Sequence, residues 1–304
     1  MSPTGTGFPS ATARVFPISA GSSGFVAIVG AGIGQVPDSG FTITGTGVRL
    51  TTASSRGVTS SGTPYVIFPI AADATAEPGL RTIVARSGGD VILYSGGIRV
   101  RPIEHNYLPA LLSGPVPGFG ETIRTGLAFF NDGDRTSQLS YAARGRDGSL
   151  LGGSGVVNPN VTSLVASAQR PILDSELFGL DPRVSTEAWV DLSSTEPGAG
   201  LFLVFDSAFS RLTDGIGLVR AAARELILPF GAPDERTMYT VANTSDAAAS
   251  VTLEFVLDSG AVAVTEERTL APRGQMSFGW RPSERGYVRV ISSAPLVAME
   301  LFGT

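Results

Sequence analysis

The chain has 304 residues, a formal net charge of −5, no cysteine and no lysine, since all 22 basic residues are arginine. It therefore has no disulfide bond, no thiolate for nucleophilic or zinc chemistry, and no lysine for a Schiff base, a P-loop or a cross-link to asparagine. Its single histidine, His105, excludes a two-histidine metal site, and no basic stripe is dense enough to predict a nucleic-acid partner.

The first segment, residues 1–12, has no regular pattern of apolar residues. It lacks the basic region and the apolar run of a signal peptide, so an extracellular setting would require that a leader has been removed. The longest apolar runs, such as Phe25–Ile33, are too short to cross a bilayer, and we expect no membrane span.

Residues 13–103 consist of short apolar runs separated by turn residues such as those of Pro37–Gly40 and Glu77–Gly79. Many short strands within about a hundred residues predict a β-sandwich. The 38 glycines and 20 prolines of the chain fit the frequent turns of such a fold. We predict strands at Ala13–Pro17, Gly24–Val29, Gly40–Thr44, Val48–Thr51, Tyr65–Ile70, Gly79–Arg86, Asp90–Tyr94 and Gly97–Arg101.

One stretch of this region imitates a dinucleotide-binding motif. Val26–Gly34 combines an apolar strand with three glycines in alternate positions. The motif works only where a helix follows and presents free N–H groups to a pyrophosphate. Here Gln35 stands at the third glycine position, Pro37–Gly40 breaks any helix, and Phe41–Thr44 reads as a strand. We therefore predict a sandwich strand with a turn, and no cofactor.

Residues 104–304 contain an internal repeat. Thr125–Asn131 aligns with Thr237–Asn243, and Leu108 and Leu228, each followed by proline, begin the two copies. Further matches pair Val157–Pro159 with Leu270–Pro272, Trp189 with Tyr287, and Leu201–Phe205 with Ala298–Phe302. We interpret this as one antiparallel sandwich encoded twice: copy 1 at residues 104–222, with an insert near 166–187, and copy 2 at residues 223–304.

These patterns predict an all-β chain of three consecutive immunoglobulin-like antiparallel β-sandwiches. On the stretches Pro17–Gly30, Phe41–Val48 and Ile70–Val84, residues 13–101 resemble bacterial immunoglobulin-like domains of the TIG type. Residues 105–304 look like the tandem β-sandwich repeats of large secreted bacterial surface proteins, on the Asn-x-x-Asp turn, the proline turn and the closing strands. The resemblance implies an extracellular or cell-surface protein that serves as a spacer, an adhesion unit or an assembly unit.

The turn of copy 1 raises the question of a metal. Asn131, Asp132 and Asp134 offer closely spaced oxygen atoms, so one hypothesis is a calcium site. Copy 2 has Asn243 and Asp246 at the same places, which suits a turn where the side chain bonds its own backbone. We favour the turn and keep the three residues as weak calcium candidates.

Three further residues have a functional and a structural interpretation. Trp280 has no aromatic counterpart in copy 1 and is our candidate for contact with a ligand such as a glycan, whereas Trp189 is expected to fill a core. We expect His105 to be a solvated or hydrogen-bonded residue at the seam between units, since no nucleophile elbow accompanies it. Asn160 and Asn243 begin N-glycosylation patterns that arise easily by chance in a chain rich in serine and threonine.

The sequence therefore predicts a non-catalytic secreted or cell-surface module with a structural or adhesive role. No set of acid, base and nucleophile converges, which disfavours a hydrolase. The alternatives are a subunit of a self-assembling extracellular filament or layer, since sheet edges accept added strands, and a carbohydrate-binding module. The expected partners are other copies of the chain, neighbouring surface proteins and, for the last alternative, glycans.

Overall fold

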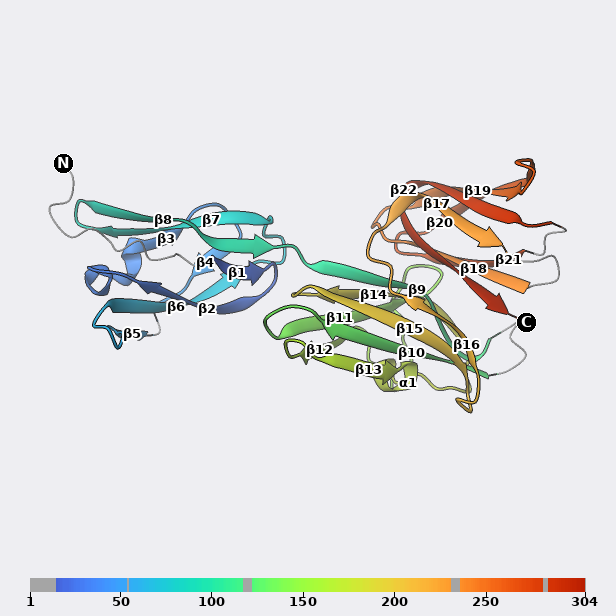
Figure 1. Ribbon diagram of the computed structural model, residues 1–304, viewed down its shortest axis with the longest axis horizontal. Helices are drawn as coiled ribbons and strands as arrows, with labels where there is room; N and C mark the ends of the chain where they lie inside the picture. Colours follow the sequence, from blue (N-terminus) through green and yellow to red (C-terminus); the bar gives the residue numbers. More distant parts are fainter. Residues whose placement is uncertain (1–14, 54, 117–121, 231–235, 281–283, 304) are drawn as a thin grey trace. The chain divides into compact units, whose positions relative to one another are not determined.

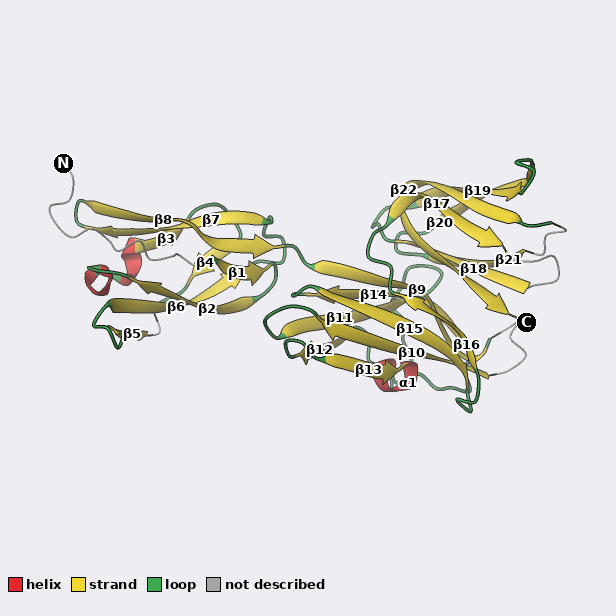
Figure 2. Ribbon diagram, in the orientation of Figure 1, coloured by secondary structure: helices red, strands yellow, loops and turns green. Residues whose placement is uncertain are grey.

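The computed structural model describes residues 15–53, 55–116, 122–230, 236–280 and 284–303 (Figure 1). It divides into two compact units, residues 1–103 and 104–304. Strands dominate both, and the helices among the described residues are single turns at Ile33–Gln35, Asp38–Gly40 and α1, Asp174–Phe178 (Figure 2). The predicted all-β sandwich fold is confirmed, while the predicted segment 1–12 lies outside the described residues.

The first unit is a sandwich of two sheets. One has the order β1-β8-β7-β3, formed by Phe16–Ser19, Asp90–Arg101, Gly79–Ser87 and Phe41–Ile43. The other joins β2 (Ser23–Val29), β6 (Pro64–Ala72), β4 (Val48–Leu50) and β5 (Ser55–Val58). Alternate residues of β6, Val66, Phe68 and Ile70, are buried between the sheets because side chains on a strand alternate between its two faces. Strand β1 pairs with β8 in parallel.

Most strands predicted in this unit are present. The sequence missed β5, and its predicted break between Tyr94 and Gly97 is absent because β8 is continuous from Asp90 to Arg101. The stretch that imitates a dinucleotide motif is β2 followed by one 3-10 turn, with Gly32 at a φ of 79°, and strand β3 follows. The local geometry is therefore the predicted strand and turn.

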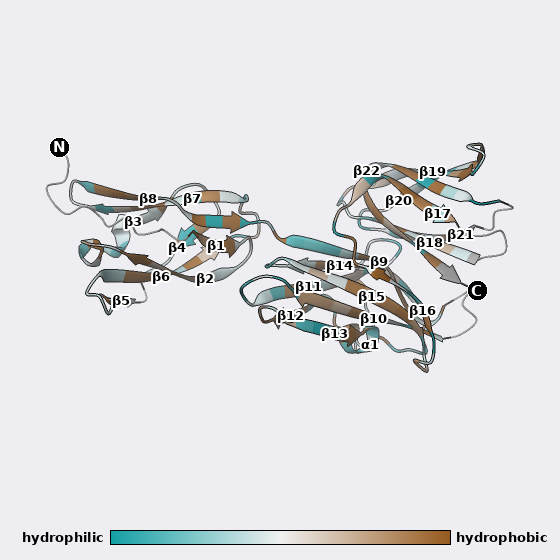
Figure 3. Ribbon diagram, viewed as in Figure 1, coloured by the Kyte–Doolittle hydropathy of each residue, from teal (hydrophilic) through white to brown (hydrophobic). Residues whose placement is uncertain are grey.

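Copy 1 also consists of two layers. The first sheet joins β12 (Asn160–Leu164), β11 (Ser137–Arg144), β14 (Thr186–Ser194) and β9 (Glu104–Pro115). The second joins β13 (Gln169–Leu173), β10 (Thr122–Asn131), β15 (Gly198–Asp206) and β16 (Leu212–Gly217). A short pairing of β9 with β10 at one end connects the two layers into a continuous eight-stranded sheet. Leu127, Phe129, Tyr141 and Phe202 fill the core between them. Apolar residues, brown in Figure 3, run along β10 and β15.

Copy 2 repeats this architecture with fewer elements. Its first sheet joins β20 (Val262–Leu270), β19 (Ala249–Leu257), the start of β22 (Gly286–Gly303) and β17 (Ala223–Phe230). Its second sheet joins β21 (Gln275–Trp280), β18 (Arg236–Asn243) and the end of β22. The long strand β22 therefore serves both sheets, since it pairs with β19 up to Ser292 and with β18 from Leu296.

The strand ladders correct two details of the alignment between the copies. Thr125 lies opposite Val204 and Thr237 opposite Phe302, so Phe302 corresponds to Val204 and not to Phe205. Ser167 and Arg273 both have a positive φ, which places the turn at residues 271–274 over residues 165–168, not over 157–159. Similarity of residue types misled the alignment because the backbone register depends on the turns and ladders.

The insert predicted near residues 166–187 also differs in the structure. Its first part is β13, which pairs with β10 as β21 pairs with β18. The extra residues of copy 1 instead lie at 145–159, between β11 and β12, and at 174–185, where α1 forms. Loops outside the sheets accept such additions because they leave the ladder unchanged.

Candidate interaction site

The side chain of Asn131 is fully buried and fully used by its turn. Its Nδ2 donates to the carbonyl oxygens of Arg135, Leu164 and Val165 at 2.7, 2.9 and 3.1 Å, and its Oδ1 accepts the N–H of Gly133 at 3.0 Å. The Oδ1 atom that calcium would require is therefore engaged in an Asx turn.

The two carboxylates of the calcium hypothesis, Asp132 and Asp134, are exposed. Within the described ranges, no three His, Asp or Glu side chains gather where they could hold a metal ion. The side chain of Asn131 thus holds the backbone of this turn, and its hydrogen-bonding groups are used by the fold.

Asn243 makes the same turn in copy 2. Its Nδ2 donates to the carbonyl oxygens of Ala247 and Ala271 at 2.7 and 3.0 Å, and its Oδ1 accepts the N–H of Ser245 at 3.0 Å. Asn160, the other asparagine of a glycosylation pattern, donates to the Leu177 carbonyl at 2.5 Å. Both amides therefore serve the fold, as the chance interpretation expects.

The His105 ring bonds to a carboxylate. Its Nδ1 lies 2.7 Å from Asp191 Oδ1, and among the described residues this is its only hydrogen-bond partner. The ring stacks on Tyr107, with 5.9 Å between ring centroids. Its hydrogen bond to Asp191 raises the pKa of His105 above its ordinary value. His105 is thus a carboxylate-bonded residue next to an aromatic ring, without the nucleophile that a triad needs.

Trp189 is fully buried, as predicted, but it lies between the two copies and not inside a sandwich. It packs against Ala242 and Val297 of copy 2, and its Nε1 donates to the Arg273 carbonyl at 2.8 Å. The other candidate tryptophan, Trp280, ends β21 opposite Thr237, and its side chain lies outside the described part. The glycan hypothesis therefore stays a prediction.

A second buried polar group fixes the contact between the copies. Gln275 Nε2 donates to the carbonyl oxygens of Pro109 and Ala188 of copy 1, at 3.0 and 3.2 Å. These two carbonyls are open to it because the pairing of β9 with β14 shifts register between Ala188 and Val190. Figure 1 shows copy 2, orange to red, against copy 1, green to yellow.

The face of copy 2 that makes this contact is the outer face of its β21-β18-β22 sheet. The residues of β18 and β22 that point away from the copy 2 core include Ala242, Val297 and Met299, all less than a tenth exposed. Met299 and Leu301 belong to the same apolar cluster as the core of copy 1. Burial of this face against copy 1 therefore joins the two sandwiches into one apolar body.

The equivalent face of copy 1 is open. In the matched ladders, Gly126 and Ala128 of β10 take the places of Met238 and Thr240, while Leu201 and Leu203 of β15 take those of Met299 and Leu301. These four residues of copy 1 line a groove of about 320 Å³. We call this surface, with Pro171, Leu173 and Phe205, the open face.

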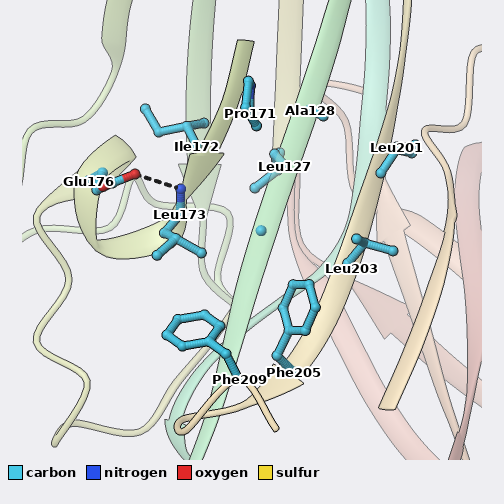
Figure 4. A pocket seen from close by; sticks show the side chains of 11 residues that line it. Leu127, Ala128, Pro171, Ile172, Leu173, Glu176, Leu201, Leu203, Phe205 and Phe209 are labelled. Carbon is cyan, nitrogen blue, oxygen red and sulfur yellow. Dashed lines mark hydrogen bonds between the residues drawn. The ribbon is translucent and has the colours of Figure 1, made fainter. Parts of the chain in front are cut away.

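The groove of the open face suits an apolar body. Leu173 and Phe205 form its walls over the small residues Gly126 and Ala128, and Phe209 stands at one end (Figure 4). Among its lining residues the one charged group is Glu176, whose Oε2 accepts the Leu173 N–H at 3.1 Å. This arrangement can bury apolar surface, but it offers no acid or base for chemistry.

The open face was missed because the sequence was interpreted strand by strand and not face by face. The segment Thr125–Asn131, which the repeat aligned with Thr237–Asn243, is part of β10, and the signal lay in the alternation of its residues. Gly126 and Ala128 are small residues at the outward positions, while Leu127 and Phe129 point inward. Small outward residues beside outward leucines indicate a hollow apolar surface.

Comparisons with known proteins give only a weak structural similarity. No protein-family model matches the chain, and no curated protein matches its sequence. No helix among the described residues is long and apolar enough to cross a membrane. Among solved structures the chain is similar to the crystal structure of domains A168-A170 from titin, at 9% identity over 96% of this chain and 94% of that chain, with a TM-score of 0.18. A TM-score this low carries no weight for the function of this chain.

Proposed function

We propose that this chain is a non-catalytic structural module of an extracellular or cell-surface protein, in which the two repeat sandwiches act as one body. The observation that carries the proposal is the contact between the copies, where Trp189 is fully buried and Gln275 bonds to two carbonyls of copy 1. Flexible tandem domains would meet through smaller and more polar surfaces. A joined pair suits a spacer or an adhesion unit.

The chemistry of the described surface supports a role without catalysis. His105 is engaged by Asp191, and the groove of the open face is lined almost wholly by carbon. The ion pair between Arg124 and Asp174, the first residue of α1, is buried and serves the fold. The resemblance of residues 13–101 to TIG-type domains and of the repeats to surface proteins supports the extracellular setting.

Thermal unfolding of the full chain tests the joined pair. We expect one cooperative transition for residues 104–304, separate from that of the first unit, because the apolar cluster continues from copy 1 into Met299 and Leu301 of copy 2. The variant Trp189→Leu should split that transition into two. Independent melting of the copies in the unaltered protein would overturn the proposal.

The setting needs its own experiment. Protease treatment of intact cells that produce the protein should remove it while a cytosolic marker survives. Full protection until the cells are lysed would contradict the extracellular or cell-surface role, and would leave the joined sandwiches unaffected.

A further inference from the structure

We infer that the open face of copy 1 binds copy 2 of a second molecule of this chain, head to tail. The inference deepens the proposed structural role and rests on it. The occupant follows from the repeat itself: the same face of the same sandwich is already covered in copy 2, where it packs against the outer face of β9 and β14 of copy 1. The sheet face that copy 2 uses to bind copy 1 is therefore present a second time, uncovered, on copy 1.

The two faces agree in residue type at three matched positions. Gln275, Met299 and Leu301 of the covered face correspond to Gln169, Leu201 and Leu203 of the open face, as the β13 and β15 ladders show. Glutamine therefore stands at the edge of both faces. Gln275 is only 3% exposed, whereas Gln169 is exposed and Leu201 is 41% exposed.

Copy 2 also carries the counterpart of the receiving surface. Inside the chain the receiving surface is made by Tyr107, Pro109 and Trp189. The pairing of Leu108 with Val190 matches that of Leu228 with Val288, so the corresponding residues of copy 2 are Ile227, Pro229 and Tyr287. Ile227 is 62% exposed, which is unusual for an isoleucine flanked by core residues. We call this second surface the receiving face.

Each molecule thus has one open face, on copy 1, and one receiving face, on copy 2. Because the two surfaces differ, their contact is heterologous and does not close a dimer by itself. Every complex keeps one free surface of each kind at its ends. Association of this kind produces chains whose length grows with concentration.

The contact between molecules should be weaker than the one inside the chain. Strand β17 pairs with β22 in regular register at Leu228–Phe230, without the shift that opens the Pro109 and Ala188 carbonyls to Gln275. Gln169 therefore lacks two equivalent acceptors. The contact rests on apolar side chains such as Ile227, next to the ion pairs of Arg289 with Glu225 and Glu254 on the same face. The two partners are also not linked covalently, so they gain no effective concentration.

Sedimentation velocity of the full chain over a wide range of concentration tests the inference. We expect reversible growth from monomer to dimer and longer species. Leu201→Glu on the open face and Ile227→Glu on the receiving face should each weaken association at least tenfold, because a charged carboxylate would lose its water in an apolar contact. Val161→Glu is the matched control, since Val161 is a strand residue 67% exposed on another sheet of copy 1.

Mixing the two variants gives the sharpest result. The Leu201→Glu protein keeps its receiving face and the Ile227→Glu protein keeps its open face, so an equimolar mixture should form a one-to-one dimer that grows no further. Association lost in Leu201→Glu but intact in Ile227→Glu would show that another surface covers the open face, and would overturn the inference. A monomer at millimolar concentration would overturn it as well.

The unfolding experiment separates this inference from the proposed function. A monomeric protein whose residues 104–304 melt as one unit would leave the structural module intact and remove only the second copy as its partner. Separate melting of the two copies would remove both, because the internal contact is the template for the one between molecules.

Discussion

The two repeat copies share their topology but differ in the surface of one sheet. In copy 2 the outer face of β21, β18 and β22 is covered by copy 1, and it presents large side chains such as Met299 and Leu301. In copy 1 the equivalent face is open and has Gly126 and Ala128 at its centre. One sandwich design therefore supports a face with large side chains that is covered and an equivalent hollow face that is open.

The difference teaches that burial is set by context and not by the fold of one copy. The Asx turns of Asn131 and Asn243 are the same, and so are the pairings of the strands that follow them. The outward positions of the matched ladders differ most in size, since Gly126 and Ala128 of copy 1 stand where copy 2 has Met238 and Thr240. The five predictions below run from the largest expected effect to the smallest.

The ion pair between Arg124 and Asp174, beside the open face, should contribute most to the free energy of unfolding. Asp174 is fully buried and accepts from Arg124 Nε at 2.9 Å, which fixes α1; the described residues of copy 2 have no such helix. Asp174→Asn should lower the free energy of unfolding by about 3–5 kcal/mol, since Arg124 would remain buried without its counter-charge. Denaturant unfolding of the full chain measures this. The exposed pair of Asp181 and Arg183 provides the control, and Asp181→Asn should change nothing measurable.

The Asx turns should be equivalent in the two copies. Asn131→Ala and Asn243→Ala should each lower the free energy of unfolding by about 2–3 kcal/mol, because each leaves buried backbone groups unpaired. Differential scanning calorimetry can compare them. A melting temperature that falls on addition of a calcium chelator would contradict the assignment of Asn131 to the turn.

The matched glutamines, Gln275 and Gln169, allow a direct comparison of the covered face of copy 2 with the open face of copy 1. Gln275→Ala should lower the free energy of unfolding by about 1–2 kcal/mol, since the Pro109 and Ala188 carbonyls lose their donor. Gln169→Ala should leave the stability of the dilute protein unchanged. Equal losses for the two variants, measured by chemical denaturation, would remove the distinction between the faces.

The first strands of the two copies differ at one inward position. Asn106 is buried in β9, and its side-chain amide finds no hydrogen-bond partner in the described ranges, while Leu226 takes its place in copy 2. Asn106→Leu should therefore raise the free energy of unfolding by about 1 kcal/mol. The reciprocal variant, Leu226→Asn, should lower it. A loss of stability in Asn106→Leu would show that the amide of Asn106 makes a stabilising interaction, and would contradict this expectation.

The smallest effect should come from pH at His105. Asp191 raises its pKa in the folded protein, while Arg273 opposes this and Glu104 adds to it. The contribution is therefore fully present below the pKa of the unfolded chain and is lost as pH rises through the higher folded pKa. It should stay under about 1 kcal/mol because the ring is partly exposed. Unfolding of His105→Gln beside the unaltered protein, at about pH 5 and pH 8, should differ only at the lower pH.

The sequence predicted what local chemistry decides. Most strands of the first unit, and the turn at Asn131, follow from alternation and turn residues. The contact between copies could not be predicted in this way. Trp189 and Tyr287 align as strand residues, yet only the assembled fold shows that Trp189 lies against Val297 while Tyr287 stays partly exposed. The open face requires the same three-dimensional knowledge.

Hydroxyl-radical footprinting of the full chain tests the central claim, that one face of the repeat is covered in copy 2 and open in copy 1. In dilute protein we predict strong labelling of Leu201 and protection of Met299, although methionine is intrinsically the more reactive side chain; Met299 is only 4% exposed. In concentrated protein Leu201 should become protected together with Ile227. Rapid oxidation of Met299 in the folded, dilute protein would contradict the claim, because it would mean that copy 2 does not dock on copy 1.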